Sequence, residues 1–163
     1  MIDLLFFLII ASYSYPLIYI IKNFNKKSVS DIICIDKCRI IIFKHFLNMC
    51  IFLLIYELLR FNLASFIVIA VFCLTFLRLL LTDVNTKEHY FYAYLLFATL
   101  FAFMLVHLNK SKYLLYIALL YSILSIITIV KIYYNNSILY SEAFLMIMFG
   151  IYFTILHSID YTT

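Results

Sequence analysis

The chain has 163 residues and a formal net charge of +4, and 67% of its residues are hydrophobic while 12% are charged; its mean hydropathy is +1.11. An ordinary soluble domain contains about 25% charged residues, so this composition excludes that class and indicates an integral membrane protein. The single glycine excludes a glycine-rich phosphate loop, and the small positive charge, which flanks apolar segments, argues against nucleic acid as a partner.

Apolar segments of membrane-spanning length follow one another along the chain. A spanning helix needs about 20 apolar residues, and the runs are continuously apolar, without the alternation of barrel strands. We therefore expect an all-α, polytopic transmembrane helical bundle of about six spans, with five as the alternative, in a single integral membrane domain covering residues 1–163. The predicted spans are 2–21, 40–59, 62–82, 90–108, 113–132 and 138–157.

The first span carries Asp3 and lacks both a basic start and a small-residue cleavage site. We therefore interpret it as a retained helix rather than as a secretory signal.

Four cysteines, two of them inside predicted spans, do not form the pattern of a disulfide framework. They are Cys34, Cys38, Cys50 and Cys73. Cys34 and Cys38 have helical spacing, but two sulfurs without a second pair are a weak metal signal. We predict no metal and no cofactor.

The basic residues are distributed unevenly between the two sides of the predicted bundle. Because successive spans alternate in direction, nine lie on or near the side of the first, third and fifth connections, and three lie on the side of the termini. The positive-inside rule then places those connections in the cytoplasm or matrix and both termini outside. The nine are Lys22, Lys26, Lys27, Lys37, Arg39, Lys44, Arg78, Lys87 and Lys131; the three are Arg60, Lys110 and Lys112.

Arg78 interrupts an apolar run and raises two alternatives. Its long side chain can reach the head groups from about one turn inside the helix end, so it can simply snorkel. Alternatively, polar residues at the same depth on four spans converge into one pocket for a proton relay, an ion or a lipid head group. The candidate intramembrane cluster consists of Lys44, His45, Arg78, Asp83, His89 and Glu142.

On the opposite side, Glu57 and Arg60 are three residues apart, which predicts a local ion pair on one helix face. His107 and His157 end their spans there, and histidines in such positions are more often interfacial anchors than ligands. No catalytic residue stands out, because no serine, histidine and aspartate triad or carboxylate pair has a recognisable signature.

Three fragments, taken in order, resemble subunit 6 of the mitochondrial NADH:ubiquinone oxidoreductase, the J-type subunit of the bacterial enzyme. They are "YIIKN" followed by "KSVSDIICI", then "LASFIVIAVFCLTFLRLLLTD" (63–83), and "SILYSEAF" (137–144). The resemblance implies a non-catalytic subunit of a proton-translocating membrane arm in the respiratory chain. Any enzyme activity would then belong to the complex, its partners would be other membrane subunits and lipids, and its location the mitochondrial inner membrane.

A second resemblance is to the Frag1/DRAM/Sfk1 group of six-span endomembrane proteins. It rests on "SVSD" (28–31), "HYFYA" (89–93) and "SEAFLMIMFGIYFTILHSID" (141–160). It implies a free-standing protein that senses or remodels lipids, with Asp31, His89 and Glu142 around a head-group pocket.

Overall fold

The computed structural model describes residues 1–22, 28–29, 36–83, 86–134 and 138–162. Within these ranges the chain forms long helices, one short 3-10 turn and no strand. The elements are α1 (Ile2–Lys22), α3 (Asp36–Leu59), α4 (Leu63–Leu81), α5 (Lys87–Val106), η1 (Leu108–Lys110), α6 (Lys112–Tyr133) and α7 (Leu139–Thr162). The described residues contain six helices that are long and apolar enough to cross a membrane. The predicted all-α helical bundle is therefore confirmed.

The helix ends differ from the predicted spans where capping side chains fix them. The oxygen of Thr86 accepts the N–H of His89 at 3.1 Å, so α5 begins at Lys87 rather than at residue 90. Asn62 caps α4 in the same way by accepting the N–H of Ser65 at 3.1 Å. A side-chain acceptor at this position satisfies an N–H group that has no partner within the helix.

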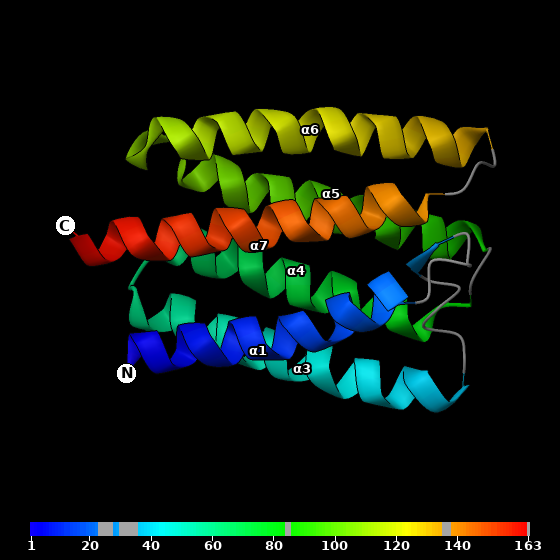
Figure 1. Ribbon diagram of the computed structural model, residues 1–163, viewed down its shortest axis with the longest axis horizontal. Helices are drawn as coiled ribbons and strands as arrows, with labels where there is room; N and C mark the ends of the chain where they lie inside the picture. Colours follow the sequence, from blue (N-terminus) through cyan, green and yellow to red (C-terminus); the bar gives the residue numbers. More distant parts are fainter. Residues whose placement is uncertain (23–27, 30–35, 84–85, 135–137, 163) are drawn as a thin grey trace.

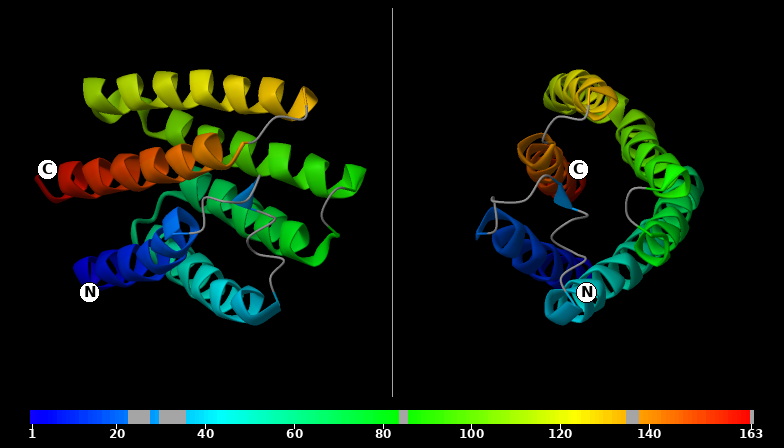
Figure 2. Two further views of the ribbon diagram at one scale, coloured as in Figure 1. Left: turned by 45° about the vertical axis from the view of Figure 1, so that its right-hand side comes forward. Right: turned by 90° about the vertical axis from the view of Figure 1, so that its right-hand side faces the viewer.

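The six long helices are arranged as a ring (Figures 1 and 2). Each helix packs against the next in the sequence, and α7 returns to contact α1. The N- and C-termini lie at the same end of the bundle (Figure 1), as an even number of alternating spans requires. The C-terminal ends of α1, α4 and α6 lie at the other end (Figure 1).

The buried side chains follow helical spacing, so each helix turns one stripe toward the interior. On α3 the stripe is Ile42, Phe46, Met49, Leu53 and Tyr56. The span of α7 buries the largest share of its residues, 50%, and that of α6 the smallest, 22%. The remaining apolar surface faces outward, as it does in a helix that is surrounded by lipid.

The seam that closes the ring lies between α1 and α7. The hydroxyl of Tyr13 donates to the backbone carbonyl of Met146, and the ring of Phe6 stacks on His157 at 3.9 Å between centroids. A Cβ atom on Gly150 would lie 3.3 Å from Cε1 of Tyr13. The only glycine of the chain therefore stands where a Cβ atom would press on the aromatic ring, which would have to shift by a few tenths of an ångström.

We predict that Gly150→Val lowers the midpoint of thermal unfolding in detergent, because its branched side chain presses on the ring of Tyr13. Overpacking of this kind costs about 1–3 kcal/mol. The control is Ile151→Val on the exposed face of α7, which should leave the midpoint nearly unchanged. Equal midpoints for Gly150→Val and the wild type would contradict the close contact.

Candidate functional site

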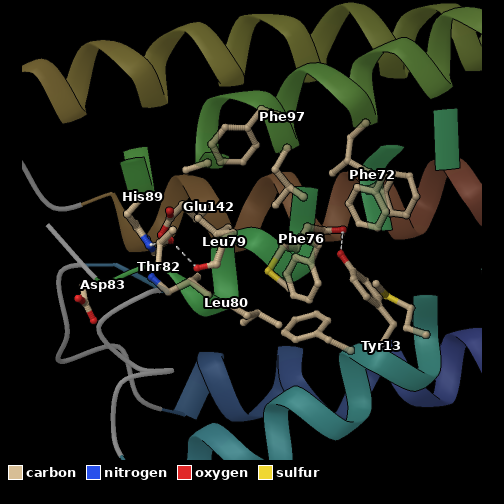
Figure 3. A pocket seen from close by; sticks show the side chains of 18 residues that line it. Tyr13, Phe72, Phe76, Leu79, Leu80, Thr82, Asp83, His89, Phe97 and Glu142 are labelled. Carbon is tan, nitrogen blue, oxygen red and sulfur yellow. Dashed lines mark hydrogen bonds between the residues drawn. The ribbon is translucent and has the colours of Figure 1, made fainter. Parts of the chain in front are cut away.

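A cavity of about 150 Å³ lies inside the ring, bounded by residues from five helices and by Val29 (Figure 3). Its walls are aromatic and aliphatic, and its polar residues gather at one end. The apolar lining consists of Val29, Phe46, Met49, Phe72, Phe76, Leu79, Leu80, Ala93, Leu96, Phe97, Leu100, Met146 and Phe149. We call Thr82, Asp83, His89 and Glu142 the polar end of the cavity, and Tyr13 lies at its far end (Figure 3).

The helical repeat explains which side chains reach the cavity. On α5 the lining includes His89, Ala93, Leu96 and Leu100, which are spaced by four, three and four residues and so lie on one face. At about 1.5 Å rise per residue, the distance from His89 to Leu100 along the axis is roughly 16 Å. That is about half of a hydrocarbon core of ~30 Å, so the lining extends through one leaflet.

The end of α4 and the start of α5 position His89 at the polar end. Thr82 follows the last residue of α4, and its hydroxyl donates to the carbonyl of Leu79 at 2.9 Å. The same hydroxyl oxygen lies 3.1 Å from Nδ1 of His89. A hydrogen bond between this hydroxyl and Nδ1 of His89 therefore orients the imidazole ring at the polar end.

Glu142 enters the polar end from the first turn of α7. Its Oε2 atom accepts the backbone N–H of Val29 at 2.7 Å, so the side chain connects α7 to the connection that follows α1. A carboxylate in the first turn of a helix is also favoured by the helix dipole. Asp83 is exposed and forms no salt bridge with any residue in the described part of the chain.

Asp83, His89 and Glu142 of the predicted cluster line the cavity, and the other three residues lie outside its lining. His45 stacks on Tyr15 at 4.4 Å between ring centroids, and Lys44 is exposed.

Arg78 also points away from the cavity, because it lies between the inward positions of α4. Its guanidinium contacts Glu88 at 3.6 Å and the hydroxyl of Tyr92 at 3.4 Å. The side chain is 59% exposed, so it occupies the outer surface.

A second polar group, at the end of the bundle that holds the termini, contains the pair predicted from sequence. Arg60 contacts Glu57 at 3.1 Å, which confirms the local ion pair. Arg60 also pairs with Asp160 of α7, and Asp160 pairs with Lys110 of η1. Ser65 of α4 donates to Glu57 at 2.6 Å. The two positive and two negative charges of this group pair with one another, so we interpret it as an ion-pair network that holds α3, α7 and η1 together.

Next to this ion-pair network, His157 connects α7 to two further helices. Its Nδ1 atom lies 2.8 Å from the hydroxyl of Tyr56, and its Nε2 atom lies 3.3 Å from a carboxylate oxygen of Asp3. Sequence reasoning treated His157 as an interfacial anchor and did not connect it to Tyr56 or Asp3. Helical spacing alone could not reveal these contacts, because they join three separate helices.

No three histidine, cysteine or acidic side chains of the described residues lie close enough together to hold a metal ion. Cys50 and Cys73 are buried and free. Asp31 and Cys34 fall outside the described residues.

We predict that Arg60→Leu lowers the stability of the protein, whereas Arg78→Leu does not. Arg60→Leu leaves the buried carboxylate of Glu57 without its cation, and removing one partner of a buried pair costs about 3–5 kcal/mol. The variant should therefore unfold at a much lower denaturant concentration than the wild type in mixed micelles. Arg78→Leu removes an exposed contact and should leave the unfolding midpoint unchanged. Comparable losses in both variants would contradict this difference between the two arginines.

No model of a known protein family, no curated protein and no solved structure matches the chain.

Proposed function

We propose that this integral membrane protein binds the hydrocarbon chain of a lipid in the cavity between its helices, with the lipid's polar group at Asp83, His89 and Glu142. One observation carries the proposal: apolar walls that extend through about one leaflet lead to a single polar end. Small-molecule sites have this character, in which apolar walls provide affinity and a few polar groups fix orientation.

The size of the cavity limits what it holds. An engineered apolar cavity of about 150 Å³ binds benzene, so the present cavity accommodates a segment of one chain rather than two whole chains. This function corresponds to the endomembrane alternative, a free-standing six-span protein that senses or remodels lipids. His89 and Glu142, two of the residues which that resemblance implies, are at the polar end.

We expect Ala93→Phe to prevent binding, because the larger side chain fills the cavity from the inward face of α5. The measurement is labelling of the purified protein by a long-chain alcohol that carries a photoactivatable diazirine near the end of its chain. The matched control is Ala98→Phe on the same helix, where the side chain is exposed. Labelling should fall at least about tenfold in Ala93→Phe and persist in Ala98→Phe.

Both variants must elute as folded protein in gel filtration and unfold near the wild-type temperature. Equal labelling of folded Ala93→Phe and wild type would show that the lipid binds elsewhere and would end the proposal.

A second candidate is a non-catalytic subunit of a proton-translocating respiratory complex in the mitochondrial inner membrane. The observation that favours it is α6, whose span buries only 22% of its residues within the chain and so leaves a long apolar face for a neighbouring helix. Small residues let membrane helices pack closely, and this face has few, so association would rely on large aliphatic side chains.

If the second candidate is correct, the chain extracted from its native membrane in mild detergent should migrate in a native gel with other membrane subunits. Leu119→Arg on the exposed face of α6 should release it from that assembly. Migration of the wild-type chain as a stable monomer would exclude this candidate and leave lipid binding untouched.

A further inference from the structure

We propose that three aromatic side chains near the middle of the bundle limit the length of the hydrocarbon chain that the cavity accepts, and that Tyr13 is the residue that sets this limit. The ligand is then a single-chain amphiphile whose chain has no more than about twelve carbons. This inference rests on the lipid-binding proposal and deepens it, because it defines the class of chain that fits.

Three aromatic residues form the end of the cavity opposite to the polar end. They are Tyr13 of α1, Phe72 of α4 and Phe149 of α7, all buried and all in the cavity lining. Figure 3 shows Tyr13 and Phe72 at the end away from His89. The ring of Phe149 packs against both of the others, with 6.5 Å between its centroid and that of Tyr13 and 6.4 Å between its centroid and that of Phe72. We call these three residues the aromatic end of the cavity.

Packed side chains lie behind the aromatic end. Phe103 of α5 and Phe153 of α7 contact Phe149 with 5.9 and 6.4 Å between ring centroids. Both are buried, and neither belongs to the cavity lining. A ligand chain that reaches Phe149 therefore meets a close-packed core, and forcing extra methylenes into such a core is unfavourable.

Tyr13 is held in place through both its hydroxyl and its ring. The hydroxyl donates to the backbone carbonyl of Met146, and the ring edge lies so close to α7 that a Cβ atom on Gly150 would be 3.3 Å from Cε1. Turning the ring aside would leave the hydroxyl without this acceptor, which is costly for a buried donor. Tyr13 therefore acts as a fixed stop for the chain.

The distance between the two ends of the cavity gives the length limit. Phe72 lies at the centre of α4, and at about 1.5 Å rise per residue it is roughly 15 Å from Thr82 along the helix axis. An extended alkyl chain with C–C bonds of about 1.5 Å advances roughly 1.25 Å per carbon. About twelve carbons therefore span the cavity, and the chain of hexadecanol is long enough to press on the ring of Tyr13.

The test uses two photoactivatable probes, decanol and hexadecanol, each with a diazirine near the end of its chain. They are supplied at equal mole fractions in phosphatidylcholine nanodiscs that contain the purified protein. The quantity measured is the labelling that excess unlabelled decanol removes, which separates the cavity from the outer surface. In the wild type the decanol probe should give at least about tenfold more of this labelling than the hexadecanol probe.

Tyr13→Ala should raise the labelling by the hexadecanol probe at least about fivefold, because removal of the ring lengthens the cavity. Tyr13→Phe keeps the ring but loses its hydrogen bond, so it should give a smaller increase, and it is the deciding variant if Tyr13→Ala does not fold. Tyr15→Ala, at an exposed position of the same helix, is the matched control and should retain the wild-type ratio. Gel filtration and thermal unfolding establish which variants are folded.

The outcomes separate the two proposals. If both probes label the wild type equally, or if the deciding Tyr13 variant is folded and keeps the wild-type ratio, the inference on chain length is wrong while lipid binding stands. If unlabelled decanol removes no labelling from either probe and Ala93→Phe labels like the wild type, lipid binding itself fails and the inference fails with it.

Discussion

A carboxylate that is removed from water inside a membrane protein needs a positive partner from the protein itself. At Glu57 the bundle supplies that partner. The side chain is fully buried, and the unpaired charge would be more costly there than almost any other defect. Arg60 supplies the charge, Ser65 of α4 supplies a hydrogen bond, and Asp160 and Lys110 continue the network to α7 and η1. The ends of helices distant in sequence are thereby held together, which fixes the ring at the terminal end.

The two ends of the ring consequently have different chemical characters. At the terminal end, charges of both signs are paired within the chain, and His157 adds a further connection between α1, α3 and α7. At the other end, Asp83, His89 and Glu142 line the polar end of the cavity, and Glu142 accepts a hydrogen bond from the backbone N–H of Val29. The polar end of the lipid site that we propose therefore lies away from the buried ion pairs.

The fold could be predicted from sequence because apolar length decides it: six runs of suitable length produced six helices. The pair of Glu57 and Arg60 was predictable for a similar reason, since its spacing is local. The polar residues of the cavity could be predicted only in part. Depth along the helix axis groups Arg78 with Asp83 and His89, but the angle around the axis separates them, because Phe72, Phe76 and Leu80 take the inward positions of α4. Contacts between helices, such as that of Tyr56 with His157, depend on how each helix is rotated about its axis relative to its neighbours. The sequence pattern of one helix does not determine this rotation.

The scarcity of glycine in this chain bears on how a cavity can form between the helices. Membrane helices normally approach one another through small residues, and this chain has one glycine, at a point where two helices touch through an aromatic ring. Among the described residues that line the cavity, Ala93 is the one small apolar residue, and the other apolar side chains are large aliphatic or aromatic groups. A composition rich in large side chains and poor in glycine would thus create internal volume as a by-product of how the helices pack. Selection for a ligand would then begin from an existing hollow rather than from a solid core.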